Sequence, residues 1–127
     1  HGLQAREHCW LCSVVPESCD HLLFGCSFSL AVWGAVLARF DIQVPPAAGC
    51  DCLQDWWQRF RASWPASLRA GADTMFGLIC WLIWKERNRC CFDGDQPDMA
   101  RVLRSVAETA ELWMQGGARN LSIMLAS

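Results

Sequence analysis

The sequence predicts a mostly α-helical protein, with a small zinc-knuckle-like module at the N-terminus and about four packed helices after it. Apolar residues recur at helical spacing through most of the chain. No short run shows the period-two alternation of a half-buried strand. Hydrophobic residues make up 53% of the 127 residues and charged residues 19%, which excludes intrinsic disorder and is enough for one domain with a core.

Charge and cysteine content narrow the class of protein. The formal net charge of −2 excludes a polycationic nucleic-acid binder. The nine cysteines are an odd number, and the chain opens without the basic and apolar segments of a signal peptide. We therefore expect an intracellular protein of a reducing compartment, nucleus or cytoplasm, and not a secreted one. The first residue is His rather than Met, which favours a fragment of a longer gene product.

The N-terminal part of the chain divides into a zinc-binding module with its following helix, 1–40, and a connector, 41–50. Ser27 can cap a helix that runs through Phe40. The apolar residues of this helix form a broad face: Leu30, Ala31, Val32, Trp33, Val36, Leu37 and Phe40. Because Pro and Gly in the connector prevent the helix from continuing, 51–127 is predicted to be a separate helical region packed on the module.

Two segments of this helical region have a clear apolar face. The first, at 53–64, follows Asp51 and is ended by Pro65. Its aromatic-rich face is expected to pack against a long helix. The residues of this face are Leu53, Trp56, Trp57, Phe60 and Trp64. The second is the last predicted helix, with Pro97 at its first position and Gly116 at its end. Its core face contains Val102, Leu103, Val106, Ala110, Trp113 and Met114.

A long helix is predicted between these segments, from Thr74 to Cys91. It is apolar on nearly every side through Trp84 and strongly polar after it, so its first half is expected to be buried. We expect Trp81 and Trp84 to fill the core. The most apolar run, 75–84, is about half as long as a membrane-spanning helix, so no membrane partner is expected.

The strongest chemical signal is a pattern of metal-ligating residues near the start of the chain. It reads Cys-x2-Cys-x8-His-x4-Cys and consists of Cys9, Cys12, His21 and Cys26. Two cysteines at this spacing can reach one Zn²⁺ from a tight turn, and a His with a further Cys completes a closed tetrahedron. The pattern predicts one structural zinc ion as cofactor. The sequence leaves open whether His8 or Cys19 replaces one of these ligands.

The last two residues of the pattern need a special backbone. On a regular helix, residues five apart are rotated by about 140°, so His21 and Cys26 would not face one ion. We predict that Gly25 adopts a left-handed conformation and brings Cys26 back. A full set of protein ligands leaves no position for a catalytic water, although Glu17 lies nearby. We therefore predict no enzymatic activity and no small-molecule substrate.

Several stretches together resemble a known family. They are Cys9-Trp-Leu-Cys12 with Pro16-Glu17, then Asp20-His-Leu-Leu-Phe-Gly-Cys26 with Phe28 and Ala31-Val-Trp33, and Trp81-Leu-Ile-Trp84-Lys-Glu-Arg87-Asn88. They resemble the zinc-binding domain that follows the reverse transcriptase of plant non-LTR (LINE-type) retrotransposons. The resemblance implies a C-terminal fragment of such a polyprotein, in which Cys9, Cys12, His21 and Cys26 are the zinc ligands. The catalytic residues of the RNA-directed DNA polymerase are not in this sequence.

The resemblance also implies contact with RNA or single-stranded DNA, or positioning of the element's RNA, with the polymerase domain as another candidate partner. The candidate contact residues are basic and lie beside the zinc pattern or beside tryptophans: Arg6, His8, Lys85, Arg87 and Arg89. Arg87 can instead pair with Glu86 or Asp93. So few cations predict weak and strongly salt-dependent binding.

Two alternatives to nucleic-acid binding stay open. One is a zinc-stabilised protein-interaction domain that docks on the polymerase or on another partner. The other is a decayed fragment without a present function. The acidic overall balance favours docking, whereas the family resemblance favours nucleic acid.

Overall fold

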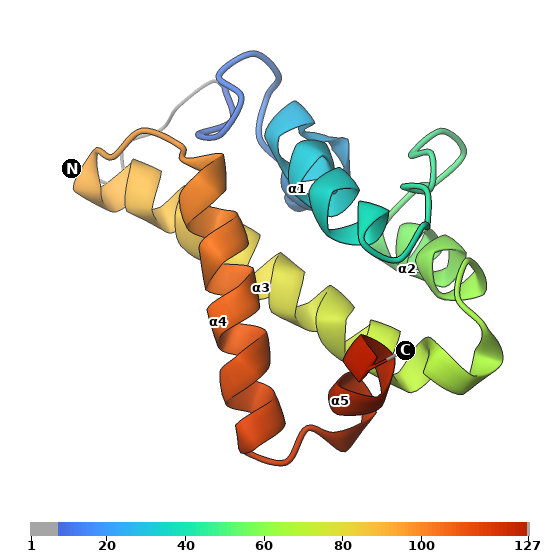
Figure 1. Cartoon of the computed structure of the whole chain (residues 1–127). Coiled ribbons are helices and arrows are strands. Elements are labelled where there is room, and N and C mark those ends of the chain that lie inside the picture. The colour runs from blue at the N-terminus through green and yellow to red at the C-terminus, as the bar shows by residue number, and fades with distance from the viewer. Residues whose placement is uncertain (1–7, 127) are drawn as a thin grey trace.

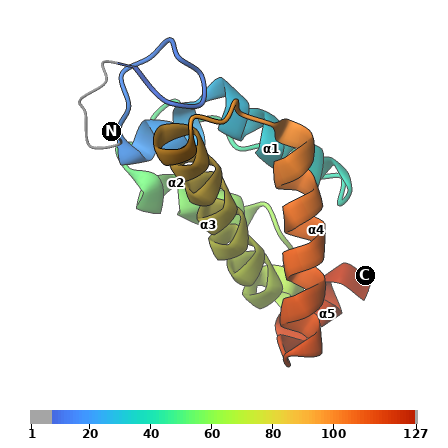
Figure 2. The ribbon, with the colours of Figure 1, turned by 90° about the vertical axis from the view of Figure 1, so that its left-hand side faces the viewer.

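The computed structural model describes residues 8–126, and this range is helical without strands, which confirms the predicted fold class. The elements, in chain order, are a π-helical turn η1 (His21–Gly25), α1 (Ser27–Ala38), α2 (Leu53–Ala62), a 3₁₀ turn η2 (Ala66–Leu68), α3 (Arg69–Asp93), α4 (Met99–Gln115) and α5 (Arg119–Ala126) (Figure 1). The long helix α3 is central, because η1, α2, α4 and α5 all pack on it. Figure 2 shows α2 and α4 on opposite sides of α3.

One hydrophobic core joins the N-terminal segment to the helical region. Its buried residues run from Cys9 to Met124, so residues on both sides of the connector contribute. At its centre is Trp33, whose ring centroid lies 5.0 Å from that of Trp56 and 5.2 Å from that of Phe76. Such edge-on and tilted ring pairs stabilise a core beyond the area that they bury. The aromatic residues of α2 therefore pack inward, as their spacing predicts.

The helix ends differ from the predicted ones for local reasons. The N-cap of α1 is Cys26 rather than Ser27, and the helix ends at Ala38. The first residue of α2, Leu53, donates its backbone N–H to the Asp20 carboxylate at 3.1 Å. A residue distant in sequence thus satisfies one of the free N–H groups that every helix start exposes. This contact fixes α2 against η1.

The last two helices also depart from the predictions. Pro97 does not start α4, because Asp98 is the N-cap and accepts the N–H of Arg101. The sequence reading missed α5, a short apolar helix that closes over the N-terminal end of α3. The fit is close at Gly71, where a Cβ atom would lie 2.4 Å from the Asn120 carbonyl oxygen. Gly71 is therefore required for the packing of α5 on α3.

The expectation that Trp81 and Trp84 fill the core is wrong. Their side chains are 53% and 43% exposed, and Trp113, predicted on the core face of the last helix, is 38% exposed. The buried side of α3 in this region contains Leu82, Ile83, Glu86 and Cys90 instead. A helix that is apolar all round does not reveal which side its neighbours cover. Here η1 and α4 cover one side of α3 and leave the tryptophans outside.

The segment Ala66–Asp93 is long and apolar enough to span a membrane when only its length and composition are considered. However, 44% of its most apolar window is buried within this fold, and the central helix of a core meets the same criterion. The described structure accounts for this hydrophobicity through the contacts of α3 with η1, α2, α4 and α5.

Candidate metal centre

Four side chains converge beside the turn η1, which carries one of them: Cys9, Cys12, His21 and Cys26. Their candidate ligand atoms all lie within 4.8 Å of one another. The Sγ atoms of Cys9 and Cys26 are 3.9 Å apart, and Cys12 Sγ is 3.4 Å from His21 Nε2. In a tetrahedral zinc site with Zn–S and Zn–N bonds of ordinary length, two sulfur ligands lie about 3.8 Å apart, and a sulfur and a nitrogen ligand lie about 3.6 Å apart. The cluster therefore fits a tetrahedrally coordinated metal ion.

The first cysteine pair lies on a tight turn. Ser13 donates its N–H to the Cys9 carbonyl at 2.9 Å, and Cys9 donates its own N–H to the Val15 carbonyl at 2.8 Å. The Leu11 N–H points at Cys9 Sγ, at 3.3 Å. Ser13 adopts a left-handed conformation with φ 61°, which reverses the chain after Cys12. Backbone N–H groups aimed at sulfur stabilise thiolate charge, as the Cys-x2-Cys spacing predicts.

The second pair is brought together by the π-helical turn, and not by a left-handed Gly25. The Cys26 N–H donates to the His21 carbonyl at 2.6 Å, an i→i+5 hydrogen bond. This wider turn reduces the rotation between residues five apart, which an α-helix would separate by about 140°. Within the described residues the left-handed glycines are Gly49, Gly94 and Gly117, so the prediction for Gly25 is wrong. A Cβ at Gly25 would lie 3.4 Å from His21 Nδ1, an ordinary van der Waals distance, so neither the backbone nor the space around it requires glycine at this position.

Helix α1 anchors this π-helical turn to the core. The Ser29 hydroxyl donates to the Leu22 carbonyl, and the Trp33 indole N–H donates to the Leu23 carbonyl at 2.8 Å. Both carbonyls belong to η1, and Ser29 and Trp33 are four residues apart, on one face of α1. Two buried donors thus satisfy carbonyls that a short π-helix leaves unpaired. The ligand-bearing turn is therefore fixed by the core.

The environment of the thiols differs across the cluster. Cys9 and Cys26 are fully buried, whereas Cys12 and His21 are half-buried. Burial would raise the pKa of Cys12, but hydrogen bonds from the Val15 and Val14 backbone and from His21 outweigh it and lower the pKa to about 6. Burial raises the pKa of Cys26 to about 12. A cation at the centre favours the thiolate form of each cysteine.

The structure selects among the residues that the sequence left open. His8 and Cys19 are exposed and are not part of the cluster, so they do not replace any of its four members. Arg6, a predicted nucleic-acid contact, lies outside the described residues. No disulfide bond joins any of the described cysteines, including the pairs at 50 and 52 and at 90 and 91.

The basic residues of α3 have defined partners. Lys85 Nζ lies over the Trp81 ring at 5.7 Å from its centroid, and the Arg87 guanidinium lies over the Trp84 ring at 5.3 Å. Arg87 pairs with Glu17, at 2.9 Å from Nη2 to Oε2. The predicted pairing of Arg87 with Glu86 or Asp93 is therefore wrong. The physical reason is that Glu86 and Asp93 extend from other sides of α3.

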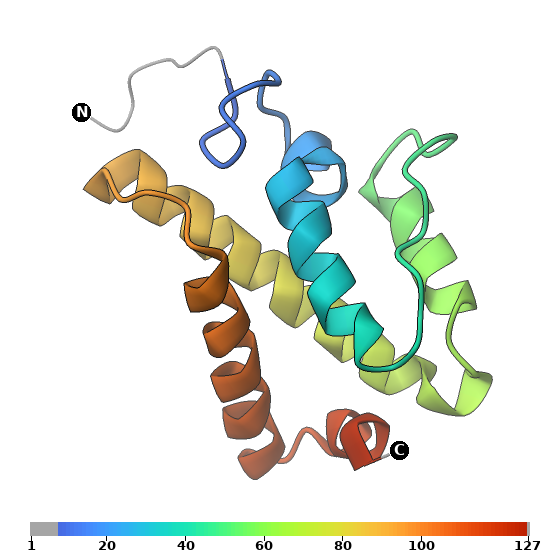
Figure 3. The same ribbon diagram turned by 45° about the horizontal axis from the view of Figure 1, so that its top comes forward.

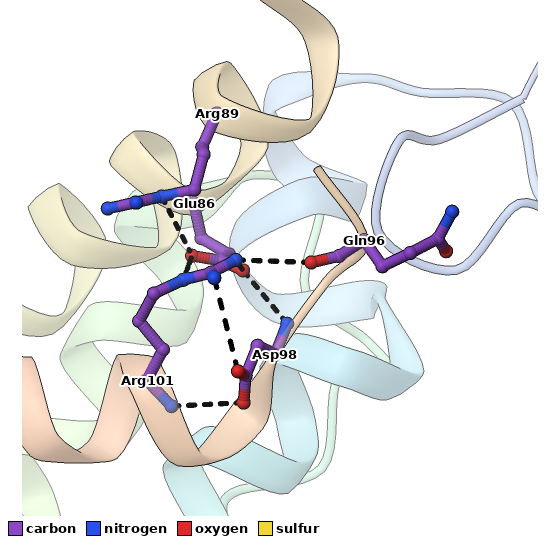
Figure 4. Close-up of polar contacts among 5 residues, drawn as sticks. All are labelled: Glu86, Arg89, Gln96, Asp98 and Arg101. Atoms are coloured by element: carbon purple, nitrogen blue, oxygen red, sulfur yellow. Dashed lines mark hydrogen bonds and ion pairs between the residues drawn. The ribbon is translucent and has the colours of Figure 1, made fainter. Parts of the chain in front are cut away.

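Glu86 is a structural residue that the sequence analysis missed (Figure 4). It is 3% exposed and accepts hydrogen bonds from Arg101 Nη2 at 2.7 Å and from the Asp98 N–H at 2.9 Å. Arg89 lies 3.8 Å from the same carboxylate. Glu86 thus satisfies the N-cap N–H of α4 and connects α3 with α4. The only sequence signals for this contact are the helix-capping residue Asp98 and the cation Arg101 three residues after it.

Over residues 8–126, the fold and the donor set define a helical protein without strands and with a Cys3His cluster that can bind a metal ion. Comparison with protein-family models, with curated proteins and with solved structures finds no match to this chain.

Proposed function

We propose that this chain is a non-catalytic structural zinc module of a LINE-type retrotransposon polyprotein, and that it contacts single-stranded nucleic acid. The observation that carries the proposal is the Cys3His cluster, in which all ligand atoms lie within 4.8 Å of one another. Three thiolates and one imidazole in tetrahedral reach favour Zn²⁺ over hard cations. When bound, zinc supplies a cross-link between the first turn and η1. The family sequence pattern supplies the link to reverse transcription.

Zinc binding is tested by metal analysis of protein purified without chelator. We expect one Zn²⁺ per chain, and Co²⁺ substitution is expected to give the intense sulfur-to-metal absorption of a thiolate site. Cys12→Ser should abolish binding of the ion. Cys19→Ser is the matched control, because Cys19 is exposed and outside the cluster, and it should keep the full metal content. Full metal content in Cys12→Ser would exclude this site.

The proposed nucleic-acid surface is the exposed side of the second half of α3. We name it the α3 face and define it as Trp81, Trp84, Lys85, Arg89 and Phe92, all of which are exposed. Exposed aromatic rings beside cations are the combination that binds single strands, since bases stack on rings and phosphates pair with cations. The same tryptophans would be expected in a core if they were structural. Their exposure supports a binding role.

Charges on the α3 face set the strength of binding. Lys85 and Arg89 are the exposed cations, although Arg89 also lies 3.8 Å from the Glu86 carboxylate, and the charge of Arg87 is paired with Glu17. Neutralisation of about two phosphates of a single strand gives a slope near −1.4 in log K against log salt concentration. We therefore expect weak binding, with most of the specificity for single strands supplied by stacking.

The test is a titration of a short fluorescent single-stranded DNA or RNA with the zinc-loaded chain. Trp81→Ala should weaken binding about fivefold or more, because stacking on one aromatic ring contributes about 1–3 kcal/mol. Trp113→Ala is the matched control, since Trp113 is also partly exposed but lies on α4, outside the α3 face. Equal effects of the two substitutions, or no binding at low salt, would overturn the nucleic-acid role.

A second candidate function is docking on a protein partner. It is favoured by a different set of exposed apolar residues, Leu112, Trp113 and Ile123, which are 65%, 38% and 49% exposed. Exposed apolar surface is typical of protein-interaction sites. Retention by the polymerase domain that is lost in Leu112→Asp, without any nucleic-acid binding, would favour this function.

A further inference from the structure

We propose that Glu17 couples the metal centre to the α3 face, so that metal loading positions Arg87 over Trp84. The inference rests on the proposed function of the α3 face and adds a mechanism that regulates it. Its basis is a continuous chain of contacts from the Cys-x2-Cys turn to an exposed tryptophan. Figure 3 shows the loop before η1 lying beside the C-terminal half of α3.

The first link is the attachment of Glu17 to the metal-binding turn. Glu17 lies between the second and third candidate ligands in sequence, and its Oε1 accepts the backbone N–H of Trp10 at 3.2 Å. Trp10 is itself located between Cys9 and Cys12. The carboxylate thus bridges the turn that carries the first two ligands and the loop that leads to His21.

The second link is the ion pair with α3. Glu17 Oε2 accepts from Arg87 Nε at 3.0 Å and lies 2.9 Å from Nη2, although the two residues are 70 positions apart. Their side chains are only 19% and 18% exposed, so solvent screens the pair less than a surface pair. Arg87 Nη1 also donates to Asn88 Oδ1 at 3.1 Å. These contacts orient the guanidinium plane above Trp84.

The third link is the dependence of the loop on the metal. Residues 13–18 form bends and irregular backbone without a helix, and this loop connects the candidate ligands Cys12 and His21. A bound ion would fix both ends of this loop through Cys12 and His21. Without the ion the loop loses its cross-link, and Glu17 is no longer held at Arg87. Arg87 then samples other rotamers, and its guanidinium no longer lies over the Trp84 ring.

The chain contains a matched comparison for this arrangement. Asp73 accepts from Arg61 Nε at 2.8 Å, and the Arg61 guanidinium lies 5.2 Å from the Trp57 ring centroid. This trio has the same carboxylate, guanidinium and indole chemistry, but it joins α2 to α3 without the metal-binding loop. It should therefore not respond to the metal.

Linkage makes the coupling measurable without nucleic acid. If zinc stabilises the Glu17–Arg87 pair, the pair must strengthen zinc binding by the same factor. Zinc affinity, measured by competition with a chromophoric chelator, should fall about fivefold or more in Arg87→Gln. Arg61→Gln should stay within about twofold of the unchanged chain, because its partner lies outside the loop.

A double substitution separates coupling from general destabilisation. Glu17→Gln keeps an oxygen for the Trp10 N–H but loses the ion pair, so Glu17→Gln with Arg87→Gln should weaken zinc binding no more than either alone. If Arg87→Gln matches Arg61→Gln, or if the two effects add, the coupling is refuted. Either result leaves the nucleic-acid role standing on its own titration.

A measurement on the unchanged sequence covers the case in which variants fail to fold. The Arg87 Nε–H resonance, assigned by through-bond correlations to its own side chain and backbone, should shift and sharpen when zinc is added. The Arg61 Nε–H resonance, assigned in the same way, should not move. If the position and width of the Arg87 resonance do not change when zinc is added, the proposal is overturned.

Discussion

Glu86→Ala is expected to be one of the most destabilising single changes to a charged residue in this fold. Glu86 is 3% exposed and is held by Arg101 and by the Asp98 N–H. Removal of one partner of a buried pair costs about 3–5 kcal/mol. After the substitution, Arg101 would still donate to the Gln96 carbonyl at 3.1 Å, and its side chain is 24% exposed. We therefore expect a loss of unfolding free energy at the lower end of this range, about 3 kcal/mol.

This free energy converts to a measurable shift of the melting temperature. With about 2.1 cal/mol/K of unfolding entropy per residue, about 3 kcal/mol corresponds to a decrease of about 11 °C. Thermal unfolding followed by far-UV circular dichroism with zinc present measures it. Glu111→Ala is the control, because Glu111 is exposed on α4 and should change stability by less than about 0.5 kcal/mol.

The reasoning also predicts how the loss can be reversed. Glu86→Leu combined with Arg101→Met should be more stable than Glu86→Ala, since the double change removes both charges and not only one. If Glu86→Ala lowers the melting temperature by less than about 3 °C, the assignment of Glu86 as a buried connection between α3 and α4 is refuted.

Three further predictions follow from burial and close contacts. Gly71→Ala should destabilise the protein, because a Cβ there would lie 2.7 Å from Met124 Cβ. Gly77→Ala should instead stabilise it by about 0.5–1 kcal/mol, because no atom lies within 4 Å of a Cβ at that position. Urea unfolding measures both changes. Trp33→Ala should cost about 3–5 kcal/mol, but Trp84→Ala less than about 1 kcal/mol, since only Trp33 is fully buried. Burial raises the pKa of Cys80 to about 12, so its thiol should resist iodoacetamide at pH 8 and react faster as the pH rises toward that value. Mass spectrometry of the alkylated peptides checks this, with exposed cysteines as the reference; equal rates at pH 8 would contradict it.

The metal cluster illustrates both the reach and the limit of sequence reasoning. The spacing identified Cys9, Cys12, His21 and Cys26, and the structure brings them together. The backbone that does so was predicted wrongly, because a π-helical turn replaces a left-handed Gly25. That turn depends on donors from α1 that satisfy its carbonyls, and such support is invisible in local sequence.

The tryptophans of α3 show a second limit. Their apolar neighbours predicted burial, but Trp81 and Trp84 are exposed. Propensity and hydrophobicity predict a helix from Thr74 to Cys91, and the structure extends it to Arg69–Asp93. A helix with apolar residues on all sides, however, has no preferred side for burial. Only the positions of η1 and α4 decide which residues are covered.

The amino-acid sequence by itself determined the helical class, the aromatic core face of α2 and the identity of the clustered thiols and imidazole. These follow from periodicity and ligand spacing, which are local properties. Tertiary structure alone decided that Arg87 meets Glu17, that Glu86 is buried beside Arg101, and which side of α3 reaches solvent. The physical reason is that charge pairing and burial depend on distances in space between segments far apart along the chain.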